Sequence, residues 1–331
     1  MRKYIFAILV SVLLSYPLQG FAEVKEIISE GTYNMGDGET PTVAESRALL
    51  QAKRVALEQA GTYVESYTKV ENLQLTKDEI QVLASGLMEV EILDKKRTII
   101  GDGIHFWVKI KAKVNLDKTE EMANKIKAKD KSFVDDYKKI QEAYDKSQKE
   151  IEELKKQLAE AKDVKERKLI EAKITDEERL FQANEWFEKG FQHWLNKEYN
   201  SAIEAFTSAI ALDPNYVYAY GNRGIAYADK GQYDRAIEDY NKVIQLDPND
   251  AEAYNNRGVA YDKKGQHDRA IEDYNKAIAL DPNFAQAYTS RGLLYLVKLG
   301  NKEKGCSDWK KACELGECGN YEIAKKNGDC R

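Results

Sequence analysis

Cysteine is the residue type in this chain with the clearest chemical potential, because all four cysteines cluster near the C-terminal end, at Cys306, Cys313, Cys318 and Cys330. Four clustered thiols can form two disulfides or bind a metal ion. The metal alternative lacks a Cys-x-x-Cys pair, and no histidine lies near these cysteines in the sequence. We therefore predict disulfides. Four cysteines allow three pairings, of which we predict Cys306 with Cys330 and Cys313 with Cys318.

Catalytic chemistry has no comparable support in the sequence. The three histidines, His105, His193 and His267, fall in separate segments and are interpreted as structural. There is no phosphate-binding glycine loop, no zinc-binding helix motif and no nucleophile elbow. The glycine-containing stretches at Gly36 and Gly101 are short turns. We expect no catalytic residue, no metal site and no cofactor, and we do not expect an enzyme.

A regular spacing points instead to a repeated structure. Leu-Asp-Pro-Asn occurs three times, starting at Leu212, Leu246 and Leu280, which are 34 residues apart. A fixed period of this length is typical of stacked helical pairs, in which each unit buries its apolar face only against its neighbours. The proline ends the second helix of a pair, because it cannot continue a helix and disfavours a helical residue before it. The spacing therefore predicts consecutive helix–turn–helix units.

The residues between these markers make the segment similar to the tetratricopeptide repeat. The pattern of that family is filled twice, by Tyr220, Gly224, Tyr227, Ala236, Tyr240 and Pro248, and again by Tyr254, Gly258, Tyr261, Ala270, Tyr274 and Pro282. The resemblance implies four units, at residues 183–216, 217–250, 251–284 and 285–316. The first unit carries His193 and Lys197 in place of an aromatic residue and the turn glycine. The fourth has one extra residue, which we place in its turn.

The resemblance also implies a right-handed superhelix whose first helices line a concave groove that binds a protein or peptide. Its second, fifth, ninth, twelfth and thirteenth positions face the ligand. Here they place in the groove Phe187, Phe191, Trp194, Leu195, Tyr218, Ile225, Asp229, Glu252, Asn255, Val259, Asp262, Lys263, Gln286, Thr289, Leu293 and Leu296. The aromatic residues of the first unit have an alternative, which is to pack beneath the helix that precedes it. The ninth position is apolar rather than asparagine, so the carboxylate clamp of some family members is not expected.

Residues 23–117 are predicted to form a small α+β domain. From Gly103 apolar and polar residues alternate, which indicates a half-buried strand with Lys109, Lys111 and Lys113 on a basic outer face. A partner strand is predicted over residues 88–99, and helices over residues 42–65 and 77–85. The helix from Ala44 to Ser66, the Ala84-Ser85-Gly86 turn and the closing strand resemble the N-terminal domain of flagellar assembly protein T.

Residues 118–182 are rich in charge and lack glycine and proline. An apolar seam with alternating steps of four and three runs through Phe133, Tyr137, Ile140, Tyr144, Ser147, Ile151, Leu154, Leu158 and Ala161. This heptad pattern predicts a long coiled-coil helix that joins two copies of the chain in a homodimer. The alternatives are a solitary charged spacer helix, supported by pairs such as Glu152 with Lys156, and an intramolecular hairpin.

The first residues resemble a secretory signal peptide. Arg2 and Lys3 precede an apolar run from Tyr4 to Leu14, and small residues follow up to Ala22. The apolar run is shorter than the roughly 18–20 residues of a membrane-spanning helix. We predict cleavage after residue 22, with an uncleaved anchor as the alternative. No later stretch is apolar enough to span a bilayer.

The expected fold is mainly α: an α-solenoid of four tetratricopeptide repeats, preceded by a coiled-coil helix and a small α+β domain. Residues 317–331 are expected to form a disulfide-stapled cap with a short helix at residues 319–326. The chain has 51 basic and 56 acidic residues, which gives no reason to expect a nucleic-acid partner. We expect a periplasmic scaffold for protein–protein interactions in envelope assembly. The alternative is a structural component of a flagellar or export apparatus that acts through its N-terminal domain.

The expected site of cleavage can be checked directly. N-terminal sequencing of the protein recovered from the periplasm should begin at Glu23. Recovery of the chain in the membrane fraction with its first residues intact would favour the uncleaved anchor.

Overall fold

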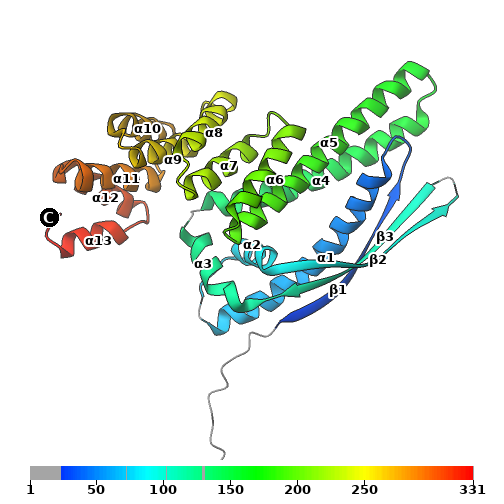
Figure 1. The fold of residues 1–331 in the computed structure, drawn as a ribbon, viewed down its shortest axis with the longest axis horizontal. Helices are drawn as coiled ribbons and strands as arrows, with labels where there is room; N and C mark the ends of the chain where they lie inside the picture. The colour runs from blue at the N-terminus through cyan, green and yellow to red at the C-terminus, as the bar shows by residue number, and fades with distance from the viewer. Residues whose placement is uncertain (1–23, 72, 102, 129–130, 331) are drawn as a thin grey trace, which may run out of the picture.

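The structure is a computed structural model that describes residues 24–71, 73–101, 103–128 and 131–330. The predicted signal peptide lies outside the described residues. A small antiparallel sheet with its helices forms the N-terminal part, and a row of helical hairpins leads from it to the C-terminus (Figure 1). This is the mainly helical fold expected from the sequence.

The N-terminal sheet has three strands in the order β1–β3–β2, all antiparallel. Its elements are, in chain order, β1 (Lys25–Met35), α1 (Pro41–Val70), α2 (Lys77–Leu87), β2 (Met88–Ile100) and β3 (Gly103–Val114). The predicted β2–β3 hairpin and both helices are confirmed. The pairing of β1 with the middle strand β3 was not predicted.

Helix α1 covers one face of β1 and β3 because its inner side is lined by small residues. Ala48, Ala52 and Ala56 are completely buried. Gly31 of β1 makes the approach possible, since a Cβ atom at this position would lie 2.1 Å from the carbonyl oxygen of Ala48. Short side chains on both elements therefore set how closely the helix and the sheet pack.

The other face of the sheet is not the basic surface that the sequence predicted. Each lysine of β3 lies opposite at least one acidic residue of a neighbouring strand, because the register places Glu26 opposite Lys113 and Glu91 opposite Lys111. The Nζ atom of Lys109 lies 3.0 Å from a carboxylate oxygen of Glu30 on β1. Cross-strand pairs of opposite charge therefore neutralise this face.

The predicted coiled coil is a helical hairpin within one chain. Its two helices are α4 (Lys131–Glu160) and α5 (Val164–Leu195), and η1 (Leu116–Lys118) and α3 (Thr119–Ala128) precede them in the chain. Asp163 begins α5 by accepting hydrogen bonds from the backbone N–H groups of Lys165 and Glu166 at 2.8 and 3.0 Å. The chain therefore reverses direction directly after α4, and α5 packs along it.

This reversal buries the heptad seam inside the chain. Tyr137, Ile140 and Tyr144 belong to the core of the N-terminal part. Further along α4, Ile151, Leu154 and Leu158 pack against Ile170 and Ile174 of α5. The intramolecular alternative is thus correct, and the expected homodimer through this seam is wrong, because the same apolar surface is already covered.

A buried polar network fastens the hairpin to the β1–α1 loop. The ammonium group of Lys155 lies 2.7 Å from Glu39, which also accepts a hydrogen bond of 2.6 Å from the hydroxyl of Tyr33. Glu178 of α5 accepts a hydrogen bond of 2.5 Å from the backbone N–H of Thr40. Paired buried charges of this kind fix one geometry, because separating them would leave each charge unsatisfied.

The first repeat begins inside helix α5, and no loop separates it from the preceding hairpin. The boundary predicted between residues 182 and 183 falls in the middle of this continuous helix. The hairpins that follow use α6 (Tyr199–Leu212), α7 (Val217–Asp229), α8 (Tyr233–Leu246), α9 (Ala251–Lys263), α10 (His267–Leu280), α11 (Ala285–Leu293) with η2 (Leu294–Lys298), and α12 (Lys302–Glu314). The last 13 residues of α5 thus serve as the first helix of the first repeat.

The extra residue of the fourth repeat was predicted to lie in the turn, and this prediction is wrong. The helix widens instead into the π-helical turn η2. After it, Gly300 has a positive φ of 65°, close to the 73° and 74° of Gly231 and Gly265 at the corresponding turns. In the first repeat Lys197 adopts this conformation, with a φ of 61°. The turn geometry is therefore the same in all four repeats.

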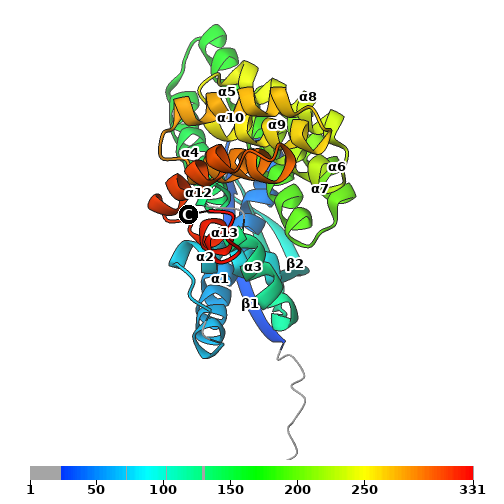
Figure 2. The ribbon, with the colours of Figure 1, turned by 90° about the vertical axis from the view of Figure 1, so that its left-hand side faces the viewer.

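The cap at the free end of the stack has the disulfides that the sequence predicted. Cys306 is bonded to Cys330 and Cys313 to Cys318. Helix α13 (Gly319–Lys326) lies against α12 at this end (Figures 1 and 2). Ala324 packs with Trp309, so the cap covers the apolar surface that a further repeat would cover.

A pair of matched substitutions tests the close approach of helices within a repeat. An added Cβ at Gly258 would lie 2.8 Å from the buried ring of Tyr274, whereas at Gly221 it would have an ordinary contact of 3.9 Å with Val243. Gly258→Ala should lower the free energy of unfolding by about 1–3 kcal/mol through overpacking. Gly221→Ala should raise it by up to about 1 kcal/mol through helix propensity. Urea unfolding would measure both, and equal effects would contradict this helix packing.

A second test compares the two disulfides. Replacing Cys306 and Cys330 by serine opens the longer loop and should cost about 3 kcal/mol, whereas replacing Cys313 and Cys318 should cost about 2 kcal/mol. Hydrogen exchange should show lost protection in α11–α13 and unchanged protection in α5 and α6, because stacked repeats couple mainly to their neighbours. Uniform loss along the stack would show that the repeats unfold as one unit.

Candidate functional site

The four repeats are held in register by a ladder of arginine–aspartate pairs. In each rung an arginine of the first helix donates two hydrogen bonds of 2.7–2.9 Å to an aspartate of the second helix and reaches a polar side chain of the preceding repeat. The rungs are Arg223 with Asp239 and Thr207, Arg257 with Asp273 and Asn241, and Arg291 with Asp308 and Asn275. Each rung therefore ties three helices together.

The geometry and the burial of the arginine–aspartate pairs strengthen their hydrogen bonds. The guanidinium group is planar and matches both carboxylate oxygens at once. Hydrogen bonds to Asp273 raise the pKa of Arg257, so the arginine stays charged. The first repeat has no rung, since Lys189 and Ala205 stand at these positions. Its first helix is held from the other side by α4.

The first helices of the other repeats carry an apolar stripe. Ile225, Val259 and Leu293 occupy the ninth position of successive repeats and therefore lie on one face, one repeat apart. Ile225 and Val259 are half-buried, and 44% of Leu293 is exposed. An apolar stripe with this exposure on stacked helices is typical of a surface that binds a protein segment.

A cavity of about 470 Å³ adjoins this stripe between the second and third repeats. Tyr218 and Ile225 of α7 line it together with the loops that precede α7 and α9. Four carboxylate residues also line it: Asp213, Asp247, Asp250 and Glu252. Burial raises the pKa of Asp250, which begins α9 by accepting a hydrogen bond of 2.8 Å from the backbone N–H of Ala253.

One wall of the cavity comes from outside the repeats. Lys139 of α4 lines it, and the Nζ atom of this lysine lies 4.7 Å from the centre of the Tyr218 ring. The helical hairpin therefore closes the groove at its N-terminal end. Lys139 is not among the predicted groove residues, because the heptad pattern indicates only which face of α4 is apolar and not what its charged residues approach.

The four groove residues predicted on the first helix of the first repeat are not open to a ligand. The core that the N-terminal part shares with the first repeats buries all four of them: Phe187, Phe191, Trp194 and Leu195. The ring centres of Phe191 and Tyr137 of α4 are 5.6 Å apart. Their predicted role as groove residues is therefore wrong, and the alternative of packing beneath the preceding helix is correct.

Five further predicted groove residues have contacts within the protein. Asp229 accepts a hydrogen bond of 2.7 Å from the indole N–H of Trp194, and Asp262 lies 3.0 Å from the imidazole of His267. Thr289 donates a hydrogen bond of 2.9 Å to Glu317 of the cap. Asn255 is completely buried, and Leu296 packs against the C-terminal cluster.

The remaining predicted groove residues are accessible to solvent. They are half-buried or exposed: Tyr218, Ile225, Glu252, Val259, Lys263, Gln286 and Leu293. Asp213 and Asp247 were not predicted, although both belong to the repeated Leu-Asp-Pro-Asn motif. Their repetition every 34 residues was a signal that could have placed them beside the groove.

No group of three or more histidine, cysteine, aspartate or glutamate residues in the described part of the chain is arranged to hold a metal ion. Among the helices in that part, none combines the length and the apolar character that crossing a membrane requires.

Comparison with known families identifies the repeats. Models described as TPR repeat or tetratricopeptide repeat match residues 195–231, 226–265, 251–284 and 273–326. A search of curated protein sequences gives no match. The resemblance of residues 23–117 to the flagellar assembly protein stays a prediction.

Several solved structures are also similar to this chain. A structure of MamA is 28% identical and covers 50% of this chain and 99% of its own, with a TM-score of 0.38. The TPR domain of Arabidopsis OM64 is 26% identical and covers 35% of this chain and 96% of its own, with a TM-score of 0.35. The first TPR of Spaghetti (RPAP3), bound to an HSP90 peptide, is 25% identical and covers 36% and 95%, with a TM-score of 0.35.

The ladder provides a stability test. Arg257→Leu should leave the buried carboxylate of Asp273 without its partner and lower the free energy of unfolding by about 3 kcal/mol. The double variant Arg257→Leu/Asp273→Leu should regain most of this loss, because no unpaired charge remains. Arg235→Leu, on the exposed side of α8, is the control and should cost about 0.5 kcal/mol or less. A double variant as unstable as the single one would contradict the role of the pair.

Proposed function

Because residues 195–326 of this chain are tetratricopeptide repeats, we propose that the protein is a scaffold that binds a segment of a partner protein along α7, α9 and α11. The observation that carries this proposal is the apolar stripe of Ile225, Val259 and Leu293, which adjoins a cavity. The arginine–aspartate ladder supports the proposal, since it fixes the spacing of the helices before any ligand arrives. A groove prepared in this way loses little conformational entropy on binding.

The chemistry of the groove defines the segment that it fits. Apolar side chains of the partner would cover the stripe and be removed from water. Basic side chains would approach the carboxylates of Asp213, Asp247 and Glu252 at the cavity. Because α4 closes the N-terminal end of the groove, the segment would lie on the second, third and fourth repeats.

The place in which we propose that the scaffold acts is the periplasm, in the assembly of the cell envelope. The signal-like sequence at residues 1–22 supports export from the cytoplasm. The two disulfides also support it, because disulfides persist in oxidising compartments.

A second candidate function is that of a structural component in a flagellar or export apparatus. The N-terminal domain would then be the part that acts. The observation that favours it is the β2–β3 hairpin, whose far end projects from the sheet clear of α1 (Figure 1). Cells that produce the chain without its repeats would distinguish the two functions. After cell fractionation, the N-terminal part should remain in a large assembly only if the second candidate function is correct.

Site-specific cross-linking tests the binding groove. A photo-reactive phenylalanine analogue would replace Leu293 in the groove or, as a control, Ile323 on α13, which is 61% exposed. Both positions are open to solvent, so neither replacement should disturb folding. We expect a partner to cross-link at position 293 in intact cells and not at position 323, and mass spectrometry would identify it.

A substitution gives the matching measure of affinity. Leu293→Asp should weaken binding of the identified partner at least tenfold, because a carboxylate in the apolar stripe is costly to remove from water. Ile323→Asp should leave binding unchanged. Equal binding by the two variants would place the partner on another surface.

A further inference from the structure

Strand β2 is an unusual edge strand, because it is long and exposed on both faces. It runs for 13 residues, pairs with β3 on one side, and within the described residues no strand pairs with its other side. Its apolar residues are accessible: 48% of Ile92 and 75% of Ile99 are exposed. An uncovered edge of this kind is a template for pairing with another strand.

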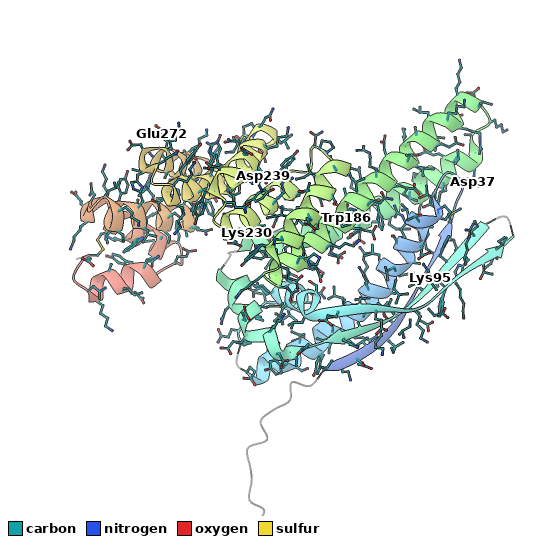
Figure 3. The ribbon with its side chains drawn as sticks, in the orientation of Figure 1. Asp37, Lys95, Trp186, Lys230, Asp239 and Glu272 are labelled. Atoms are coloured by element: carbon teal, nitrogen blue, oxygen red, sulfur yellow. A yellow bond between two sulfur atoms is a disulfide. The ribbon has the colours of Figure 1, made fainter. Side chains whose placement is uncertain are left out.

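The space beside β2 is also open. Helix α1 lies over β1 and β3, so a groove of about 540 Å³ remains between α1 and the inner face of β2. Ile92, Lys95 and Arg97 line this groove, and Lys95 spans it to reach Glu45 of α1 at 2.7 Å. Figure 3 shows Lys95 on the β2–β3 hairpin, beside α1.

The charges along β2 are ordered so that the strand complements itself. Its first half carries Glu89, Glu91 and Asp94, and its second half carries Lys95, Lys96 and Arg97. In an antiparallel pair of two β2 strands, the acidic half of each strand lies beside the basic half of the other. This is the requirement of a symmetric contact, in which the same surface serves on both copies.

The other edge of the sheet lacks this property. On its solvent face β1 carries Glu26 and Glu30, and no basic residue lies between them or after them in the strand. Two β1 strands would therefore form no ion pair on this face in any register. Self-pairing is thus a feature of β2 alone among the two edges.

In one register of two antiparallel β2 strands, side chains that point to the same side of the sheet lie opposite each other. The β-bulge between Ile92 and Asp94 shifts the side-chain alternation by one residue, so that Glu91 and Lys96 point to the same face. If the two bulges meet at the centre, Glu91 of each copy lies opposite Lys96 of the other. On the α1 side, Met88 then lies opposite Ile99, which buries an exposed apolar side chain at each end.

We propose that two copies of this chain associate through antiparallel pairing of their β2 strands, which joins the two sheets into one sheet of six strands. The contact would give each β2 edge its missing hydrogen bonds and form two Glu91–Lys96 ion pairs. The groove beside α1 would receive inner-face side chains of the second copy. The two sets of repeats would remain free to bind partner segments.

Charge reversal on the full-length protein tests this arrangement. Glu91→Lys and Lys96→Glu should each raise the Kd of the dimer at least tenfold in sedimentation equilibrium, because each places two pairs of like charges in contact. The double variant Glu91→Lys/Lys96→Glu should dimerise as the unchanged protein does. An equimolar mixture of the two single variants should form heterodimers, since all contacts between them are again of opposite charge.

A control variant separates the effect of the β2 edge from that of a charge change elsewhere on the same face. Lys113→Glu changes the same charge on the same face of β3, one strand away from the edge, and should leave the Kd unchanged. Glu91→Lys places a lysine opposite Lys111, and Lys113→Glu places a glutamate opposite Glu26, so both should lower the melting temperature slightly. Circular dichroism should show that every variant is folded at the temperature of the sedimentation experiment, so that a change in Kd reports on the contact between copies. A monomeric unchanged protein at 100 µM, or single variants that do not form heterodimers when mixed, would overturn the proposal.

Discussion

The architecture depends on helix α5, because this one helix belongs to two bodies at once. Its first half pairs with α4 and anchors the β1–α1 loop through Glu178, and its last residues form the first helix of the repeats. Phe187 and Phe191 lie in a core shared by both parts. One continuous helix that packs in both parts therefore joins the N-terminal part directly to the repeats.

Two kinds of contact stabilise the stack of repeats: one within each repeat and one between neighbouring repeats. Glycine opposite an aromatic ring, as at Gly258 and Tyr274, lets the two helices of one repeat approach closely. The arginine–aspartate rungs add links to the preceding repeat. Packing and polar contacts thus act on the same helices, and the groove between them has a defined width before a ligand binds.

The two candidate binding surfaces differ in the physics of recognition. The groove of the repeats offers separated side chains, with an apolar stripe beside carboxylates, and so selects a partner by its sequence. The edge of β2 offers backbone hydrogen bonds, which any strand could use, and its charge order restricts that choice to its own antiparallel copy. A dimer of this kind would present two grooves, so that a partner with two binding segments gains avidity.

The sequence by itself determined the features that depend on local spacing. The 34-residue period located the repeats, and the positions of Cys306, Cys313, Cys318 and Cys330 along the last helices indicated both disulfides. The alternation in β3 likewise indicated its buried face, because side chains of a strand point alternately to its two sides.

Only the tertiary structure decided which surfaces stay open. The heptad seam of α4 is equally suited to a second copy and to α5, and the short turn at Asp163 selects α5 because that helix is already beside it. For the same reason Phe187 and Trp194 are buried rather than available to a ligand, and the lysines of β3 are neutralised by β1 and β2. An amphipathic pattern shows that a face must be covered; the identity of its cover depends on contacts between residues far apart in the chain.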